Sequence, residues 1–134
     1  MVNPHPLVAV HGKNVHAIDP VTGRILWAYD AKLLVARFAL AQGRVYALDD
    51  QSKIHCLDAA TGAVVGVVPT DAPERSACAL IADGARLYVA TTRSVVAIDA
   101  DGTIAWRAEV GGSWDARAGL GLPGNVAQPD FDTR

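Results

Sequence analysis

The stretch HAIDPVTGRILW, residues 16–27, decides the fold because it is the first of three copies of one pattern. An apolar run ends in Ala-x-Asp, a polar turn closes with Thr-Gly, and a second apolar run carries a Trp four residues after the Gly. The pattern returns as CLDAATGAVVG at 56–66 and as AIDADGTIAW at 97–106, at intervals of about 40 residues. The chain is therefore built from repeats rather than from one hairpin.

A second shared pattern precedes the later two copies, FALAQGRVYA at 38–47 and ALIADGARLYVA at 79–90. Each repeat then holds four short apolar runs that Gly, Asp or Thr-Gly separate, which indicates four antiparallel strands. A period near 40 with four strands per unit is typical of a β-propeller blade. We predict an all-β fold, a β-propeller of four-stranded antiparallel blades with about three blades in the chain.

The repeat residues have physical roles that explain their spacing. The Asp side chain can accept hydrogen bonds from the backbone N–H groups of the turn that it opens, and the Gly supplies the positive φ that closes a hairpin with a bulge. A Trp on the returning strand can lay its ring against the turn of a neighbouring blade. The predicted structural repeat motif consists of Ala17, Asp19, Thr22, Gly23, Trp27, Asp58, Thr61, Gly62, Asp99, Gly102 and Trp106.

The complete copy at Ala17–Trp27, Ala-x-Asp-x-x-Thr-Gly-x-x-x-Trp, resembles the tryptophan-docking repeat of the PQQ-like (quinoprotein-type) β-propellers. That family includes alcohol dehydrogenases and an outer-membrane assembly lipoprotein, and the resemblance covers nearly the whole chain. The second copy departs from the pattern with Gly66 in place of Trp, and in the third copy Asp101-Gly102 shortens the turn by one residue. The resemblance implies that the second blade docks less firmly.

The first copy begins inside its blade. Residues 6–11 align with the second strands of the later blades, at 44–48 and 86–90, so we expect the first blade to lack its innermost strand. The predicted limits are 6–32, 33–73 and 74–112 for the three blades, 116–126 for an innermost strand that latches onto the first blade of a neighbouring chain, and 127–134 for a tail, all within one domain, 1–134.

Three blades are fewer than the roughly four to eight of closed propellers, which leaves sheet edges and blade faces to be covered. Two chains related by a two-fold axis would make a six-bladed ring, in which each 116–126 strand completes the partner's first blade. We therefore predict a homo-oligomer, with a dimer favoured and a further protein partner left open. The predicted interface residues are Leu7, Val8, Val10, Leu120, Leu122 and Val126.

Composition and charge argue against several classes of partner. The net charge is −2 and the Lys and Arg residues are scattered singly, so we expect no nucleic-acid surface. Residues 1–6 lack the basic and then apolar pattern of a signal peptide, and no apolar run approaches the ~18 residues that span a bilayer, so we expect no membrane contact and a cytoplasmic location. Cys56 and Cys78 fit no Cys-x-x-Cys spacing and are expected to be small buried thiols.

The site chemistry of the resembling enzymes is not recognisable in this sequence. Quinoprotein dehydrogenases carry an adjacent-cysteine pair, a calcium site and a catalytic Asp, so we predict no catalytic residue, no cofactor and no enzyme activity. His16 and His55 hold equivalent places in two repeats, but the third repeat has Val96 there. Packed or hydrogen-bonded histidines are therefore favoured over a ring of metal ligands.

The favoured function is a non-catalytic interaction or assembly subunit that self-associates into a closed ring and presents loop surfaces to protein partners. The alternative is a small-ligand site in the central channel, where Arg37, Ser76 and Arg117 would converge. A part-propeller subunit of an enzyme complex is the third candidate. Trp114, in a Gly-Gly-Ser region, is expected to matter less to stability than Trp27 or Trp106.

Overall fold

The computed structural model describes residues 5–70, 77–84, 86–99, 101–111 and 119–127. These residues form β-strands joined by turns and short connections, and the all-β prediction is confirmed. Within these ranges no helix is long and apolar enough to cross a membrane.

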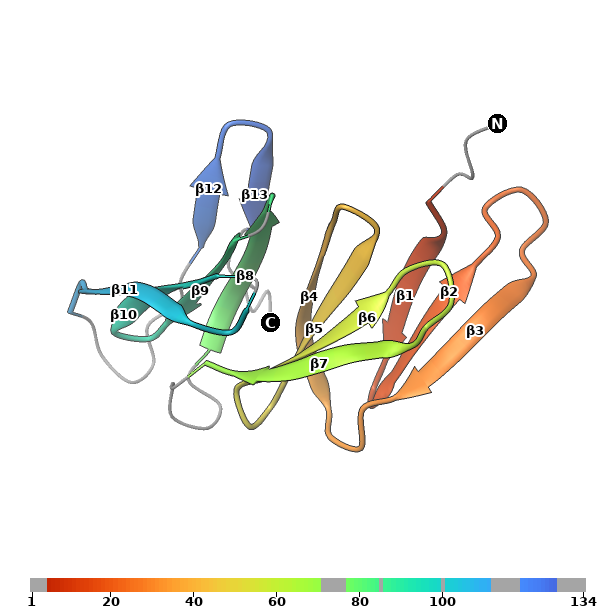
Figure 1. The fold of residues 1–134 in the computed structure, drawn as a ribbon, viewed down its shortest axis with the longest axis horizontal. Helices are drawn as coiled ribbons and strands as arrows, with labels where there is room; N and C mark the ends of the chain where they lie inside the picture. The colour runs from red at the N-terminus through yellow and green to blue at the C-terminus, as the bar shows by residue number, and fades with distance from the viewer. Residues whose placement is uncertain (1–4, 71–76, 85, 100, 112–118, 128–134) are drawn as a thin grey trace, which may run out of the picture.

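Two complete blades form the middle of the chain (Figure 1). Each is a four-stranded antiparallel sheet in which strands consecutive in the sequence pair with each other. The predicted four-stranded blade is therefore confirmed. Blade 2 consists of β4 (Val35–Ala41), β5 (Arg44–Asp49), β6 (Lys53–Asp58) and β7 (Val64–Pro69), and blade 3 of β8 (Ala77–Asp83), β9 (Arg86–Thr91), β10 (Ser94–Asp99) and β11 (Ile104–Glu109).

Blade 1 is a three-stranded antiparallel sheet in the order β1-β2-β3. Its register repeats that of blade 2, because Leu7 lies opposite Ile18 as Val45 lies opposite Leu57. The first strand of blade 1 thus holds the position of a second strand, and it forms one edge of its sheet. The strands are β1 (Leu7–His11), β2 (Asn14–Ile18) and β3 (Ile25–Asp30).

The C-terminal strand prediction was wrong in one respect. The described part of 116–126 forms two strands, β12 (Leu120–Leu122) and β13 (Asn125–Ala127), which pair with each other as an antiparallel hairpin. The sequence Leu-Pro-Gly-Asn explains the turn, since Pro favours its second position and Gly124 takes a φ of 76° at its third. Ala127 therefore belongs to a strand rather than to the predicted tail, while 116–118 and 128–134 lie outside the described residues.

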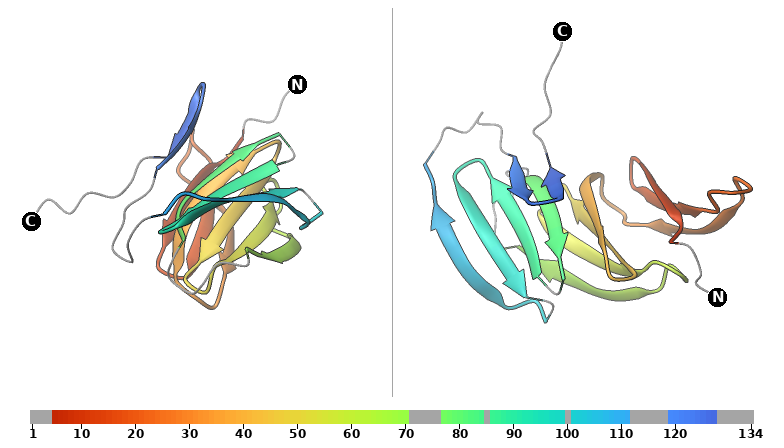
Figure 2. Two further views of the ribbon diagram at one scale, coloured as in Figure 1. Left: turned by 90° about the vertical axis from the view of Figure 1, so that its left-hand side faces the viewer. Right: turned by 90° about the horizontal axis from the view of Figure 1, so that it is seen from above.

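The sheets follow one another along an open arc, with blade 1 at one end and blade 3 at the other (Figure 2). The first strands of blades 2 and 3, β4 and β8, lie side by side, as the innermost strands of neighbouring propeller blades do. The β12–β13 hairpin lies next to β8, and the Asn125 side-chain amide donates to the Ala82 carbonyl at 2.6 Å. The chain is a partial propeller of about three blades.

Apolar side chains fill the two spaces between the blades. Since strand residues alternate between the two faces of a sheet, β5 and β6 turn one set of side chains toward blade 3 and the other toward blade 1. Both sets are buried because a sheet lies against each face of blade 2. The largest fully buried residues are Leu48, Ile54, Val96, Ile98 and Val89 between blades 2 and 3, and Val15, Val45 and Leu57 between blades 1 and 2.

Candidate functional site

The β2–β3 turn is held rigidly by its own residues. Asp19 Oδ1 accepts hydrogen bonds from the backbone N–H groups of Val21 at 2.8 Å and Thr22 at 3.4 Å. The bond from Val21 is the main reason why the pKa of Asp19 lies below its usual value. Gly23 closes the turn at a φ of 77°, where a side chain would strain the backbone. The turn is exposed, so it is a preformed feature of the surface.

The β6–β7 turn repeats this geometry one blade later. Asp58 Oδ1 accepts from the backbone N–H groups of Ala60 at 2.8 Å and Thr61 at 3.2 Å. The Thr61 hydroxyl oxygen accepts from the backbone N–H of Ala63 at 3.2 Å, and Gly62 takes a φ of 78°. The two turns are therefore interchangeable in backbone shape.

Trp27 of blade 1 docks on the β6–β7 turn of blade 2. Its indole Nε1 donates a hydrogen bond to the Ala59 carbonyl oxygen at 2.8 Å. The ring lies so close over Gly62 that a Cβ built there would be 2.6 Å from the Trp27 ring. On its own sheet Trp27 lies opposite the fully buried Ala17, whose small side chain leaves room for the indole. Tryptophan and glycine thus form one contact between two blades.

Between blades 2 and 3, no tryptophan of the described residues docks on the turn that corresponds to residues 58–62. Gly66 stands opposite Cys56 where blade 1 has Trp27 opposite Ala17, and Val68 of the same strand comes within 3.7 Å of a Cβ built on Gly102. The shorter third turn also uses different acids: Asp101 Oδ1 accepts from a backbone N–H at 2.9 Å, while Asp99 Oδ1 accepts from the Arg86 guanidinium at 2.9 Å. This ion pair raises the pKa of Arg86.

Trp106 of blade 3 has the same place in its blade as Trp27 but keeps 43% of its surface exposed. It lies opposite Ala97, as Trp27 lies opposite Ala17, and both sheets contain a register shift directly after that alanine. Its ring lies 6.1 Å from that of Tyr88 on the same face of the sheet. All of β11 is exposed, including the face on which Trp106 lies.

The predicted interface residues are placed in two different environments. Val8 is only 7% exposed and packs with Val10 against blade 2 inside the chain, which corrects the expectation that they meet a neighbour. They were misplaced because alternation along β1 turns them toward blade 2 and turns Leu7 away from it. Leu7 is 55% and Val126 64% exposed, whereas Leu120 and Leu122 are half-buried.

A buried polar chain also joins blades 1 and 2. His55 Nε2 lies 2.8 Å from Asp49 Oδ2, and its Nδ1 lies 2.7 Å from the Tyr29 hydroxyl oxygen. Asp49 Oδ1 accepts in addition from the backbone N–H groups of Gln51 and Lys53. Burial raises the pKa of Tyr29, so the phenol stays protonated to a higher pH than usual. His55 is thus a hydrogen-bonded interior residue, and both of its partners, Tyr29 and Asp49, lie outside the structural repeat motif.

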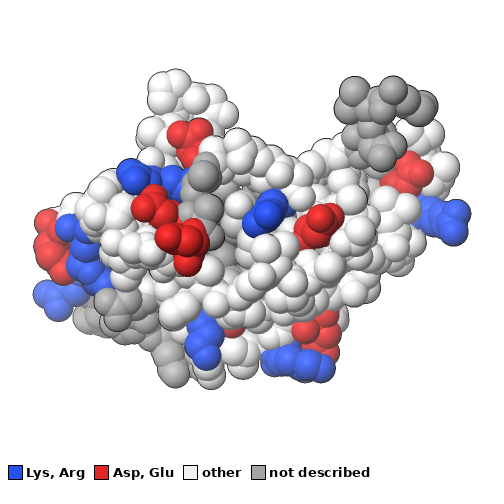
Figure 3. Space-filling view, viewed as in Figure 1, with Lys and Arg blue, Asp and Glu red and all other residues white. Residues whose placement is uncertain are grey.

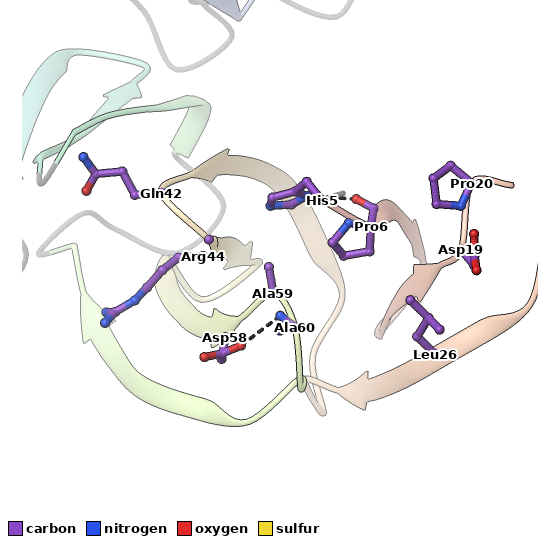
Figure 4. Close-up of a pocket in the computed structure, with 11 residues that line it drawn as sticks. His5, Pro6, Asp19, Pro20, Leu26, Gln42, Arg44, Asp58, Ala59 and Ala60 are labelled. Carbon is purple, nitrogen blue, oxygen red and sulfur yellow. Dashed lines mark hydrogen bonds between the residues drawn. The ribbon is translucent and has the colours of Figure 1, made fainter. Parts of the chain in front are cut away.

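A groove of about 670 Å³ opens between blades 1 and 2 on the face that carries their turns (Figure 4). Asp58 and Arg44 supply opposite charges at one end, and Asp19 lies at the other. Between them the lining is mostly apolar, with Pro6 and Leu26 among its residues. The groove therefore combines the apolar surface and the few fixed polar groups that are typical of binding sites.

Of the three residues predicted to converge in the central channel, only Arg37 lies in the described part of the chain. Arg37 of β4 is half-buried, and its guanidinium donates to the Ala36 carbonyl oxygen at 2.9 Å. Ser76, Arg117 and Trp114 lie outside the described residues, as does the side chain of Cys78, so the channel site stays a prediction. Cys56 is a buried free thiol. Among the described residues no three His, Cys, Asp or Glu side chains are grouped so that they could hold a metal ion.

Charges of both signs are dispersed over the face shown in Figure 3. Basic and acidic side chains alternate across the blades, and no single-sign stripe forms on this face. This face therefore offers mixed charge and apolar area rather than an electrostatic path for a polyanion.

Comparison with known proteins gives one family. The family described as outer membrane protein assembly factor BamB matches residues 11–124. No curated protein matches the sequence.

Three solved structures with the same fold are larger than this chain. BamB from Moraxella catarrhalis is 20% identical, with a TM-score of 0.65 over 81% of this chain and 34% of its own. Quinohemoprotein alcohol dehydrogenase from Comamonas testosteroni is 26% identical, with a TM-score of 0.63 over 77% of this chain and 19% of its own. The WD40 repeats of RRP9 are 13% identical, with a TM-score of 0.69 over 78% of this chain and 35% of that chain. The chain thus spans about a third or less of each.

Proposed function

Because this chain belongs to the PQQ-like β-propeller family, in the branch described as outer membrane protein assembly factor BamB, we propose that it is a non-catalytic interaction module. In this proposal the chain self-associates into a closed ring and presents its turns and loops to protein partners. The family description names an assembly factor, and the fold likeness to quinoprotein dehydrogenases covers only a small part of those enzymes. An assembly role is therefore favoured over an enzymatic one.

The observation that carries the proposal is the exposed apolar surface at both ends of the arc. Trp106 and Val110 are exposed at the blade 3 end, and Leu7 and Ile25 at the blade 1 end. Such surfaces are buried between blades elsewhere in this molecule, and soluble proteins rarely leave them uncovered. Two copies with three blades each would give a ring of about six blades, within the range of closed propellers.

Ring closure in this form requires one exchange of strands. β12 and β13 pair across Gly124 as β4 and β5 pair across Gly43, so they hold the first two positions of a next blade. β1 is itself a second-position strand, and it would take the place of β13 beside β12 of the other copy. β1 has five residues and β13 has three, so the exchanged pairing has the longer ladder available.

The groove between blades 1 and 2 is the loop surface that we propose for a protein partner. Its apolar middle and charged ends suit an extended polypeptide segment with both apolar and charged side chains. Arg44→Glu should release proteins that the wild-type chain retains on an affinity matrix. Lys53 lies at the start of β6, at the end away from the groove residue Asp58, so Lys53→Glu should retain them. Equal retention by both variants would exclude the groove as the partner surface.

Sedimentation over a range of concentrations tests the self-association. The proposal expects a particle of twice the 14.0 kDa chain mass that dissociates on dilution. A single 14.0 kDa species at every concentration would contradict it. A cytoplasmic location stays a prediction, which cell fractionation would test.

A further inference from the structure

The two end faces of the arc match the two sides of an interface that the chain already contains. Between blades 1 and 2, a tryptophan opposite a buried alanine meets a turn that opens with Asp and closes with Gly. Blade 3 presents the tryptophan half of that contact at its free end, and blade 1 presents the turn half at the opposite end. The intact contact therefore serves as a template for a second one.

The turn half is equivalent in detail. Pro20 follows Asp19 as Ala59 follows Asp58, so its carbonyl oxygen holds the place of the one that accepts from the Trp27 indole. Gly23 has a φ of 77° against 78° for Gly62, and a Cβ built on it meets nothing within 4 Å. The space that Trp27 occupies over Gly62 is thus open over Gly23.

The face beside this turn is equivalent as well. Leu7 holds the place of Val45 and Ile18 that of Leu57, according to the strand registers of blades 1 and 2. Val45 and Leu57 are fully buried against blade 1, whereas Leu7 is exposed and Ile18 half-buried. Blade 1 therefore carries the apolar face that receives a preceding blade.

We propose that Trp106 of one copy docks on the Asp19–Gly23 turn of a second copy, head to tail. The indole Nε1 donates to the Pro20 carbonyl oxygen, and the ring lies over Gly23. This inference rests on the proposed self-association and names the residues that make it. A second copy is the occupant because one chain carries both halves of the contact, each equivalent to a side of its own interior interface.

The intermolecular contact is weaker than its template for a stated reason. In the template Tyr29, two residues after Trp27, bonds to buried His55. The corresponding residues here are Ala108 and His16, which have no such pair to form. Self-association should therefore depend on concentration rather than persist at high dilution.

Three variants test the docking. Trp106→Ala removes the donor, Gly23→Ala places a methyl group where the ring should lie, and Gly43→Ala is the matched control. Gly43 has a φ of 74° with nothing within 4 Å of a built Cβ, so it shares the backbone strain of Gly23 without the proposed contact. The Kd for self-association is measured by sedimentation, and circular dichroism confirms that each variant is folded.

The proposal expects Trp106→Ala and Gly23→Ala each to raise the Kd by about 30-fold or more, as loss of an interface tryptophan anchor does, while Gly43→Ala leaves it within a few-fold of wild type. Mixing the Trp106→Ala and Gly23→Ala chains should restore pairs, because one supplies an intact turn and the other an intact tryptophan. If the wild-type chain associates and both variants associate with the same Kd, the docking is overturned but the ring proposal stands. A wild-type chain that is monomeric throughout overturns both.

Discussion

The docking of Trp27 on Gly62 predicts a large difference between two glycine substitutions that are matched in backbone shape. Gly62 and Gly23 have φ values of 78° and 77°, so Ala at either position pays the same penalty for the left-handed region, about 1 to 2 kcal/mol. Only at Gly62 does the new Cβ meet a ring, at 2.6 Å from Trp27. The indole must then move away from the turn.

The additional cost follows from what the indole loses. Its hydrogen bond to the Ala59 carbonyl contributes roughly 0.5 to 1.5 kcal/mol, and the half-buried ring loses part of its packing as well. Gly62→Ala should therefore lower the free energy of unfolding by about 1 to 3 kcal/mol more than Gly23→Ala does.

Urea denaturation measures both values by linear extrapolation. The variants are compared in a Trp106→Ala background, so that the intermolecular contact proposed for Gly23 affects neither of them. In a further Trp27→Ala background the difference should fall to within about 0.5 kcal/mol, because the ring that distinguishes the two sites is gone. Equal losses for Gly62→Ala and Gly23→Ala with Trp27 present would refute the docking geometry.

Three further predictions concern single side chains. Trp27→Ala should lower the free energy of unfolding by about 3 kcal/mol, the low end for a large aromatic because the ring is half-buried, whereas Trp106→Ala should cost a dilute monomer less than about 1 kcal/mol, as thermal or urea melts would show. Because the pKa of Tyr29 is raised in the folded state, its contribution to stability is full below the unfolded pKa near 10 and is lost as pH rises through the folded pKa. Tyr29→Phe should therefore flatten the loss of stability at alkaline pH. An unchanged dependence of stability on alkaline pH would contradict the burial of the phenol. The lowered pKa of Asp19 means that its contribution is present above the unfolded value near 4 and is lost as pH falls through the folded value, so Asp19→Asn should be less acid-sensitive than wild type in melts between about pH 2 and 5.

Local signals in the sequence were enough for the blades. Strand length, alternation and the Asp and Gly of each turn are decided by neighbouring residues, so the repeats at 16–27, 56–66 and 97–106 predicted the four-stranded units correctly. The absence of a tryptophan at Gly66 was likewise visible in the sequence, and in the structure Val68 rather than an indole lies beside Gly102.

The turn at Pro123-Gly124 is a further local signal in the sequence. It divides the C-terminal segment into β12 and β13, and three-residue strands are too short to show clear alternation. A Pro-Gly pair after two leucines does indicate a turn, so this correction lay within reach of the sequence.

Only the tertiary structure decided which faces meet. Whether Val8 or Leu7 points toward blade 2 depends on how the sheets stack, because either face of an alternating strand can be the inner one. The bond between Tyr29 and His55 joins residues 26 apart from different blades, and no local pattern specifies such a pair. The difference between the docked Trp27 and the exposed Trp106 arises in the same way, since the two hold equivalent places in their repeats and, within the described part of the chain, only Trp27 has a next turn beside it.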